Sequence, residues 1–374
     1  MTEPVSWLES ASDGAARSGV MSTPHGVVDT PNFMAVGTRA TVKTLDTVDL
    51  EGLGAQIVLA NTYHLMLRPG QDVVSGLGEL HGFMAWDKPI LTDSGGYQVL
   101  SLDPKITEDE LIFRSSYDGS KVGLSPERSV EVQEVLGADI AMVLDVPVNL
   151  PASRSATERA MHRTLRWAER SVAAKQRSDR ALFGIVQGGA ERDLRKTSAV
   201  ETADIGFPGF GIGGLVVGEG DKERAIAIDA VVPSLPEGAV RYVMGLGDTE
   251  GILDAVGRGI DLFDCVLPTR LARHGKALAR GGDLSMRRTE WTNDASPIEE
   301  DCPCLACERY SRGYIRHLII TKELLASRLL TLHNLAYTYR LMGDIRLHIA
   351  AGTFGAFADD VTGRRRQGIG QADR

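Results

Sequence analysis

Eight short apolar segments, rich in β-branched residues, recur along the chain. Most are continuously apolar rather than alternating, as expected of parallel strands that are covered on both faces. Helical patterns lie between several of them, and repeated strand–helix alternation predicts an α/β fold, the (β/α)8 or TIM barrel. We predict strands at Asn32–Val36, Ile57–Ala60, Pro89–Thr92, Asp139–Leu144, Leu182–Val186, Gly209–Ile212, Arg241–Met244 and Asp261–Val266.

Residues that favour helix ends lie between these strands. Ser125-Pro126 supplies a capping serine and a first-turn proline for a helix that Gly137 ends. Ser155 and Glu158 have the spacing of a capping box, ahead of an amphipathic helix that reaches about Ser178.

Two further signals complete the outline of the barrel. The long gap between the third and fourth strands contains Tyr117-Asp118-Gly119-Ser120, which is typical of a hairpin turn, so we predict an inserted hairpin. Asp248 is the expected N-cap of a helix that ends near Gly257 or Gly259.

The pattern changes after the eighth strand. We interpret residues 284–342, which contain three cysteines and helical segments, as a zinc-binding subdomain inserted near the C-terminus of a single catalytic domain, 1–374. A last helix, from Ile345 to about Asp360, is expected to close the barrel. The tail at 362–374, with its arginines, glycines and glutamines, is predicted to be disordered.

Composition limits the class of protein. Hydrophobic residues make up 43% of the 374, enough for a packed core. The first twenty residues include three acids and no apolar core, so we expect no signal peptide. No apolar run approaches the roughly 18 residues that span a bilayer. We therefore expect a cytoplasmic protein that does not enter a membrane.

The formal net charge of −9 argues against a general nucleic-acid binder. A nucleic-acid site would have to be a local basic patch, and one such stretch exists. It contains one acid, Asp283, and six basic residues: Arg270, Arg273, Lys276, Arg280, Arg287 and Arg288. A solvated charged surface is an equally good explanation of this stretch by itself.

Polar residues follow the predicted strands at their carboxyl ends, where TIM barrels carry their active sites. Of two carboxylates across a glycosidic carbon, one can attack the anomeric carbon while the other handles protons on the leaving group. A third can accept two N–H groups from the edge of a guanine-type base, and an amide or a backbone N–H can donate to the carbonyl oxygen of that edge. The chain offers Asp93, Asp145 and Asp264 as carboxylates, and Gln187 and Gly214 as donors.

Residues 209–214 match the G-x-G-x-x-G pattern of dinucleotide-binding loops. The match is weak, because no acidic residue closes a βαβ unit at the usual spacing of about 20 residues. Close approach of the backbone to a flat ligand explains these glycines better.

Three of the four cysteines, Cys302, Cys304 and Cys307, form a C-x-C-x2-C pattern that indicates a metal site. A closed tetrahedral structural zinc needs a fourth ligand, and His317 and His333 are the candidates. Cys265 lies in an apolar strand, so we interpret it as a small core residue rather than a nucleophile.

Motifs over nearly the whole chain resemble one family, the tRNA-guanine transglycosylases. The matching segments occur in the family's order, which makes chance agreement negligible. They are Val36-Gly37-Thr38, Asn61-Thr62-Tyr63-His64-Leu65, Asp93 to Gln98, Ser125-Pro126-Glu127-Arg128, Gln187-Gly188, Gly213-Gly214-Leu215 with Gly218-Glu219, Met244-Gly245, Asp264 to Arg270, the three cysteines and His333-Asn334.

The resemblance implies a role for each matching position. Asp264 would be the nucleophile and Asp93 the general acid/base. Substrate-binding residues would be Ser94, Gly95, Gly96, Tyr97, Asp145, Gln187, Gly214, Leu215 and Met244, with Tyr97 and Met244 on the two faces of the base. RNA-binding residues would be Gly245, Leu246, Gly247, Asp248, Thr249, Glu250, Gly251, Thr269, Arg270, Leu271, Ala272 and Arg273. The ligands of one structural Zn2+ per subunit would be Cys302, Cys304, Cys307 and His333.

The implied reaction exchanges the wobble guanine of a tRNA with a G-U-N anticodon (the Asp, Asn, His and Tyr types) through a covalent aspartyl–ribosyl intermediate. Val36 matches the bacterial pattern, in which the incoming 7-deazaguanine is 7-aminomethyl-7-deazaguanine (preQ1), a step of queuosine biosynthesis. Val146-Pro147-Val148 departs from that pattern, because many bacterial relatives have Glu-Cys in the first two places. Members of the family usually form homodimers.

Two other functions compete with this interpretation. A retaining hydrolase of nucleosides or glycosides would use the same two carboxylates but needs neither a basic RNA patch nor a zinc subdomain. A non-catalytic tRNA-binding subunit would tend to lose its catalytic carboxylates, whereas Asp93 and Asp264 are both present.

Overall fold

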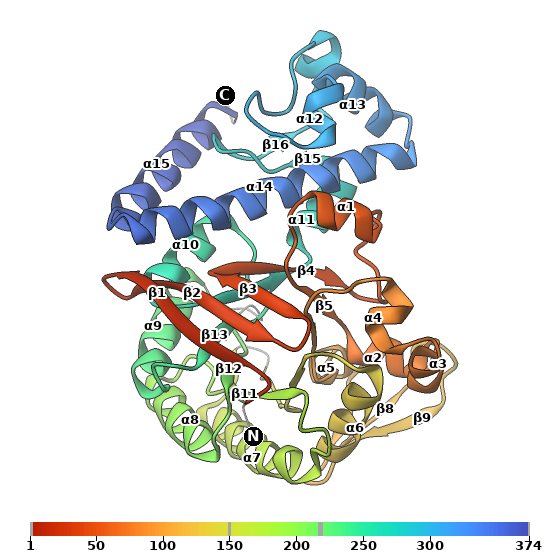
Figure 1. Ribbon diagram of the computed structural model, residues 1–374, viewed down its shortest axis with the longest axis vertical. Coiled ribbons are helices and arrows are strands. Elements are labelled where there is room, and N and C mark those ends of the chain that lie inside the picture. Colours follow the sequence, from red (N-terminus) through yellow and green to blue (C-terminus); the bar gives the residue numbers. More distant parts are fainter. Residues whose placement is uncertain (1–2, 149–150, 216–219, 373–374) are drawn as a thin grey trace.

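The computed structural model describes residues 3–148, 151–215 and 220–372. Its centre is a closed barrel of parallel strands in chain order, and pairing of Ile140 with Leu91 joins the fourth strand to the third (Figure 1). All eight predicted strands are confirmed to within a few residues. They are β4 (Asn32–Gly37), β5 (Val58–Ala60), β6 (Ile90–Thr92), β10 (Ile140–Met142), β11 (Ala181–Val186), β12 (Gly209–Ile212), β13 (Val240–Val243) and β14 (Leu262–Cys265).

Helices surround the barrel and follow most of its strands. Those beside the barrel are α1 (Thr47–Gly52), α2 (Thr62–Leu67), α3 (Gln71–Gly76), α4 (Glu79–Met84), α5 (Gly96–Leu100), α6 (Pro126–Leu136), α7 (Arg154–Ala174), α8 (Arg192–Ile205), α9 (Asp221–Val231), η1 (Val232–Ser234), α10 (Thr249–Gly257) and α11 (Leu267–Arg273). Those of the C-terminal part are η2 (Thr289–Asn293), α12 (Leu305–Arg309), α13 (Arg312–Ile320), α14 (Leu324–Ala350) and α15 (Phe354–Ala372).

The predicted helix ends are mostly correct. Ser125 caps α6, which ends at Gly137 in the left-handed conformation, and Asp248 caps α10. The prediction for α7 was wrong at both ends, because Ser153 rather than Ser155 accepts the capping bond and the helix ends at Ala174 rather than about Ser178. Serine is a favoured N-cap residue at either position, so the sequence alone did not show which of the two serines begins the helix.

Three small sheets accompany the barrel. The predicted hairpin is confirmed as β8 (Leu111–Arg114) and β9 (Lys121–Leu124), with β7 (Lys105–Ile106) added at one edge. A short pair, β15 (Lys276–Ala277) with β16 (Leu284–Ser285), leads into the metal-ligand region. The N-terminal sheet of β1 (Ser6–Asp13), β2 (Ala16–Thr23) and β3 (Gly26–Thr30) was not predicted.

The N-terminal sheet lies against the end of the barrel where its strands begin. Arg17 of β2 donates to Asp261, just before β14, at 2.9 and 2.5 Å, and to the carbonyls of Glu237 and Ala239, just before β13. The N-terminal sheet thus covers the end of the barrel where the strands begin, and the opposite end, where the strands finish, is the mouth at which TIM barrels carry their active sites.

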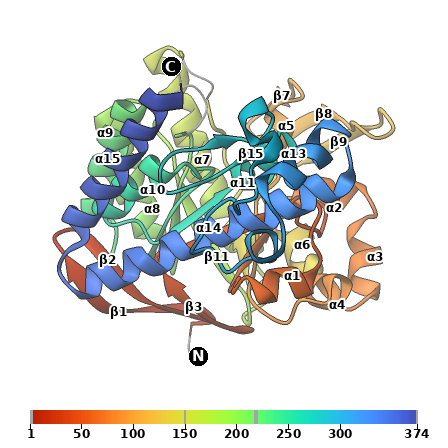
Figure 2. The same cartoon turned by 90° about the horizontal axis from the view of Figure 1, so that it is seen from above.

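Two predictions about the C-terminal helices were wrong. Ile345 does not start a helix but lies inside α14, which runs from Leu324 to Ala350; Gly352, at φ 65°, then separates α14 from α15. The proposed disordered tail continues as helix α15 to Ala372, beside α10 and α14 (Figure 2). Residues 373–374 lie outside the described residues.

Ion pairs explain why the tail is ordered. Arg365 is buried and donates to Glu250 at 2.7 Å, to Asp283 at 2.8 Å and to the carbonyl of Ala279 at 2.7 Å. Within the described residues, no helix is both long enough and apolar enough to cross a membrane.

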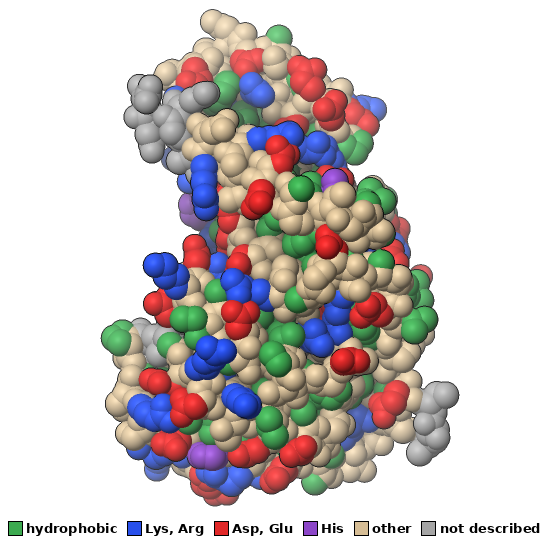
Figure 3. Space-filling model, turned by 90° about the vertical axis from the view of Figure 1, so that its left-hand side faces the viewer, with side chains coloured by type: hydrophobic (Ala, Val, Ile, Leu, Met, Phe, Trp, Pro, Cys, Tyr) green, Lys and Arg blue, Asp and Glu red, His purple; other side chains and the backbone are tan. Residues whose placement is uncertain are grey.

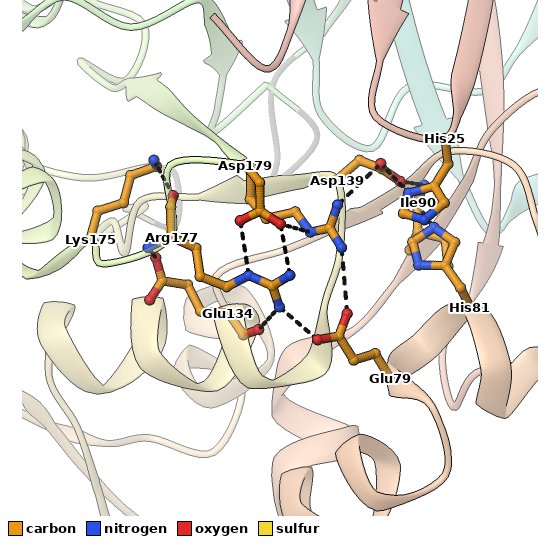
Figure 4. Close-up of polar contacts among 10 residues, drawn as sticks. His25, Glu79, His81, Ile90, Glu134, Asp139, Lys175, Arg177 and Asp179 are labelled. Carbon is orange, nitrogen blue, oxygen red and sulfur yellow. Dashed lines mark hydrogen bonds and ion pairs between the residues drawn. The ribbon is translucent and has the colours of Figure 1, made fainter. Parts of the chain in front are cut away.

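A polar cluster closes the N-terminal end of the barrel beneath β6 and β10 (Figure 4). Asp139 is fully buried and accepts from His25 at 2.7 Å, from His81 at 3.1 Å and from the backbone N–H of Ile90 at 2.8 Å. The two imidazole rings stack with centroids 3.6 Å apart. Although burial alone would raise the pKa of Asp139, the bonds from the two histidines and Ile90 lower it.

Arg180 joins this cluster to more exposed residues on the outside of the barrel. Its guanidinium lies 4.0 Å from Asp139 and 3.4 Å from Glu79, and Arg177 bridges Glu79 and Asp179. His25, His81 and Asp139 have ligand types that suit a metal ion. Asp139 is nevertheless already paired by four neighbouring groups, so we interpret the cluster as structural.

We predict that Asp139→Ala lowers the free energy of unfolding by about 3 kcal/mol or more, because His25, His81 and the N–H of Ile90 all lose the carboxylate to which they donate. Because the pKa of Asp139 is lowered in the folded protein, its contribution is complete above about pH 4 and is lost only as the pH falls below that. Urea unfolding at pH 7.5, pH 4.5 and pH 2.5 tests both statements. The exposed Asp179→Ala is the matched control, and a loss as small as that of the control, under about 1 kcal/mol, would contradict the prediction.

Candidate active site and metal centre

The predicted carboxylates meet at the mouth of the barrel. Asp93 follows β6, Asp145 follows β10, and Asp264 lies near the end of β14. The negative charge of Asp93 contributes to raising the pKa of both other carboxylates, which shows that the three lie close together. Because all three occupy the carboxyl ends of barrel strands, the fold concentrates charge where TIM barrels carry out chemistry.

Asp264 presents one free carboxylate oxygen. Its Oδ1 accepts from the hydroxyl of Tyr242 at 2.5 Å and from the backbone N–H of Gly245 at 2.7 Å. No hydrogen bond within the described residues reaches Oδ2. Burial raises the pKa of Asp264 to about 6, although the bonds from Tyr242 and Gly245 oppose this rise. The group is therefore an anion above pH 6 with one oxygen available for attack.

Asp93 is held by four donors. Oδ1 accepts from the backbone N–H groups of Thr62 at 2.8 Å and Gly95 at 3.2 Å, and Oδ2 accepts from the side-chain amides of Asn61 at 2.5 Å and Gln98 at 2.8 Å. Burial raises the pKa of Asp93 in spite of these four bonds. A raised pKa makes a carboxylate a better proton acceptor and lets it hold a proton more readily, which is the property that a general acid/base needs.

Asp145 and Gln187 form the third part of the mouth. Gln187 Nε2 donates to Asp145 at 2.7 Å, and Ser94 Oγ donates to its other oxygen at 3.4 Å. Burial raises the pKa of Asp145 to about 6 against these bonds. A Cβ atom on Gly214, at φ 65°, would lie 2.7 Å from Gln187 Oε1, so only glycine leaves room for this amide.

Sequence reasoning missed a buried arginine beneath this part of the mouth. Arg195 of α8 is fully buried and donates to the carbonyls of Gly189 at 2.8 Å, Gly213 at 2.7 Å and Gly214 at 3.2 Å. It therefore joins the loops that follow β11 and β12. Tyr242, the partner of Asp264, was also missed, since its predicted strand gave no sign of a polar contact.

The other predicted substrate-binding residues lie around the same mouth. Tyr97 on α5 is 55% exposed, whereas Leu215 is buried. Met244 is half-buried, and its sulfur would lie 3.1 Å from a Cβ on Gly211. Gly95 and Gly96 begin α5 directly after Asp93. The motif residues Gly218 and Glu219 lie outside the described residues.

The predicted RNA-binding segments flank Asp264. One runs from Gly245 into the first turn of α10, and the other is the last part of α11. Arg270 is exposed and Arg273 is half-buried, but Leu246, Gly247, Thr249, Gly251, Thr269 and Ala272 are buried. Of the six basic residues between Arg270 and Arg288, five are exposed, so this patch faces solvent.

The three clustered cysteines and His333 come together in a buried site. His333 Nδ1 lies 3.6 Å from Cys302 Sγ, 3.8 Å from Cys304 Sγ and 3.3 Å from Cys307 Sγ. Its other ring nitrogen lies 2.7 Å from the carbonyl oxygen of Leu278, which fixes the ring with Nδ1 toward the sulfurs. The four side chains could hold a metal ion, and His333 rather than His317 is the fourth member.

Cys265 has no part in this group. Burial raises the pKa of its thiol to about 11, and a Cβ on Gly247 would lie 2.3 Å from Cys265 Cβ. Both observations agree with the prediction of a small packed residue rather than a nucleophile.

The chain matches the family model described as "Queuine tRNA-ribosyltransferase" over residues 12–367. It is 50% identical over 355 residues to a queuine tRNA-ribosyltransferase of Herpetosiphon aurantiacus, covering 94% of this chain and 91% of that protein. A protein of the same name from Cereibacter sphaeroides is 48% identical over 371 residues, covering 98% of this chain and 99% of that one. The chain therefore belongs to the queuine tRNA-ribosyltransferase family and is a pentosyltransferase of the tRNA-guanine transglycosylase type.

Proposed function

We propose that this protein exchanges the wobble guanine of tRNAs with a G-U-N anticodon (the Asp, Asn, His and Tyr types) for preQ1. The observation that carries the proposal is the asymmetric environment of Asp264, which has one oxygen held by Tyr242 and Gly245 and the other free. The family relationship supports tRNA as the substrate, and Val36 at the end of β4 favours preQ1 over a bulkier base.

In the first step, Oδ2 of Asp264 attacks the ribose C1′ and the bond from C1′ to guanine N9 breaks. The bonding electrons stay with guanine, and Asp93 supplies the proton that it needs to leave. The product is an ester between Asp264 and the tRNA. Tyr242 and Gly245 position the carboxylate by binding only Oδ1.

In the second step, the N9–H of the incoming base gives its proton to Asp93. N9 attacks C1′, the ester bond to Asp264 breaks, and both carboxylates return to their starting states. The reaction needs no redox cofactor or ATP, because one glycosidic bond replaces another.

The base would be recognised by the Asp145–Gln187 side of the mouth. As a carboxylate, Asp145 accepts the ring N–H and the exocyclic amine of a guanine edge, while Gln187 and the N–H of Gly214 donate to its carbonyl oxygen. Tyr97, which is exposed, and Met244 would lie on the two faces of the base. A base in such a pocket has left its stack, which a single-stranded anticodon loop permits.

The tRNA would lie across the two segments that flank Asp264, with phosphates near Arg270 and Arg273. We further propose a homodimer in which the second subunit helps to hold the tRNA. Exposed apolar side chains support self-association: Val48 on α1 is 74% exposed, Ile320 at the end of α13 50%, and Leu324 at the start of α14 87%.

Guanine exchange tests the catalytic proposal. We expect radiolabelled guanine to enter an unmodified tRNA with a G-U-N anticodon, and Asp264→Asn to lower the rate at least about 10³-fold, because the amide cannot form the ester. Asp204→Asn, an exposed change on α8, is the matched control and should keep the wild-type rate. Release of free guanine or ribose without incorporation would instead indicate a hydrolase, and tRNA binding without exchange a non-catalytic subunit.

The raised pKa values predict an acid limit to activity. Asp264 must be ionised to attack and Asp145 must be ionised to accept two N–H groups, and both have a pKa of about 6. We expect kcat/KM to fall as the pH drops through about 6, with a slope between one and two on a logarithmic plot. Circular dichroism at each pH would show that the protein stays folded. A rate that is constant down to pH 5 would contradict this assignment.

We propose that the metal at the cysteine cluster is one structural Zn2+ per subunit. Tetrahedral zinc with bonds of about 2.3 Å to sulfur and about 2.05 Å to nitrogen places these atoms about 3.6 Å apart. The observed distances from His333 Nδ1 to the three sulfurs, 3.3 to 3.8 Å, fit this arrangement. Four protein ligands leave no position for substrate, so the ion would organise the chain between β16 and α14.

We predict that Cys304→Ser loses most of the bound zinc and lowers the thermal unfolding midpoint by about 5 °C or more. Cys265→Ser should keep one zinc per subunit in atomic absorption, because it changes the single cysteine outside the cluster. Equal zinc content in the two variants would rule out this ligand set.

A further inference from the structure

Basic side chains gather around one aromatic ring on the rim of the barrel mouth. The guanidinium carbons of Arg39 and Arg68 lie 5.4 and 4.8 Å from the ring centroid of Tyr117, and the Tyr117 hydroxyl lies 3.0 Å from His64 Nδ1. Lys43 lies in the same loop as Arg39 and is close enough to act on the charge of His64. We call these five residues, Arg39, Lys43, His64, Arg68 and Tyr117, the rim cluster.

The fold places the rim cluster beside the catalytic carboxylates. Its members come from the loop after β4, from α2 after β5 and the residue that follows this helix, and from the β8–β9 turn inserted after β6, which are neighbouring sectors of the barrel. Helix α2 begins with Asn61 and Thr62, the same residues that bind Asp93. The hydroxyl of Tyr63 on α2 lies 2.8 Å from Ser116 Oγ. This hydrogen bond attaches the β8–β9 turn, which contains Tyr117, to α2.

The cations of the rim cluster have no acidic partner in direct contact among the residues that the structure describes. Within the described residues, the side chains of Arg39, Lys43 and Arg68 form no ion pair and no hydrogen bond. Of the acids close to the cluster in sequence, Asp49 pairs with Arg328 at 2.6 Å, whereas Asp118 accepts only from neutral groups such as the hydroxyl of Ser120 at 2.8 Å and forms no ion pair with the cluster.

Elsewhere, cations and acids of this acidic protein are mixed, as on the face drawn in Figure 3. Arg258, for example, pairs with both Asp229 and Asp254. Burial lowers the pKa of His64, and the charges of Arg39 and Lys43 lower it further, which reflects the positive potential around the cluster.

We propose that the rim cluster binds the phosphate backbone of the tRNA next to the nucleotide in the active site. An arginine that stacks on a ring keeps its N–H edge free for phosphate oxygens, so Tyr117 holds two such edges in place. Because β14 pairs with β4, the cluster lies in the sector next to α11, which carries Arg270 and Arg273.

The two positive sites would form one track along the β14, β4 and β5 side of the mouth. Asp145 and Gln187 face the base from the strands across the barrel. This inference rests on the proposed function, and it adds a contact that neither the basic stretch after Asp264 nor the base pocket supplies. RNA is favoured over an acidic protein because the target nucleotide must enter the mouth that the cluster borders.

The test compares two double variants in equilibrium binding of a fluorescent anticodon stem-loop. Arg39→Ala/Arg68→Ala should raise Kd at least about tenfold at 0.15 M salt and reduce the slope of log Kd against log salt by about 1.4, as for two lost phosphate contacts to a single strand. Arg159→Ala/Lys196→Ala removes the same charge from exposed residues of α7 and α8 that form no ion pair with any described residue, and should change Kd less than about twofold.

Two variants of Tyr117 separate the stacking ring from its hydroxyl. Tyr117→Phe keeps the platform for the two arginines and should bind the stem-loop within about twofold of wild type. Tyr117→Leu removes the platform and should weaken binding by about threefold or more. The KM for guanine, measured with saturating tRNA, reports whether the base pocket has stayed intact in each variant.

An unchanged Kd and salt slope in Arg39→Ala/Arg68→Ala would overturn the proposal. So would weaker binding accompanied by a changed sedimentation coefficient, since that result would make the cluster a contact between protein chains. If the wild-type protein binds the stem-loop but exchanges no guanine, the proposed function is wrong. The difference between wild type and Arg39→Ala/Arg68→Ala in the slope of log Kd against log salt still decides whether the rim cluster contacts phosphate.

Discussion

Withdrawal of three carboxylates from water in one barrel mouth, Asp145 buried and Asp93 and Asp264 half-buried, is the constraint on which the rest of this site depends. An ionised carboxylate away from water is costly unless donors replace its hydration. The neighbouring strands and loops supply such donors: Tyr242 and Gly245 for Asp264, Gln187 and Ser94 for Asp145, and four groups for Asp93. Compensation is incomplete, because burial still raises all three pKa values. For Asp145 and Asp264, whose pKa values are about 6, this incomplete compensation keeps each carboxylate close to the pH at which it gains or loses a proton.

The C-terminal helices fix the segments that surround this mouth. Asn334, next to His333, donates to the carbonyls of Pro268 at 2.9 Å and Lys276 at 3.1 Å and accepts from the N–H of Leu278 at 2.8 Å. The metal-ligand cluster is thereby connected to α11, the helix that directly follows Asp264. Arg365 does the same for α10 through Glu250. An ion at this cluster would therefore act on the proposed RNA-binding segment of α11 without contacting the substrate.

The barrel was predictable because each strand is a short apolar run that needs only local sequence to be recognised. The N-terminal sheet was not, since β1 is mostly exposed and an irregularity between Glu9 and Ala11 interrupts the alternation of the two residues that it packs on the core, Trp7 and Ala11. The prediction of a disordered tail was wrong for a different reason. Arg365 in the tail pairs with Asp283 and with Glu250, which are 82 and 115 residues away in sequence. Its local composition of arginine, glycine and glutamine indicates disorder, and only the assembled fold supplies the acids that order it.

The same distinction applies to the site. Asp93, Asp145 and Gln187 could be found because strand ends of a barrel converge whatever the intervening sequence is. Arg195 could not, because its partners are backbone carbonyls, which carry no residue type that a sequence pattern could match. The concentration of positive charge in the rim cluster could not be predicted from the sequence either. Arg39, Arg68 and Tyr117 belong to three separate segments of an acidic chain, and only the ring of Tyr117 brings the two arginines together. A net charge of −9 therefore does not exclude RNA binding, since what RNA meets is the local field at the mouth rather than the sum over the surface.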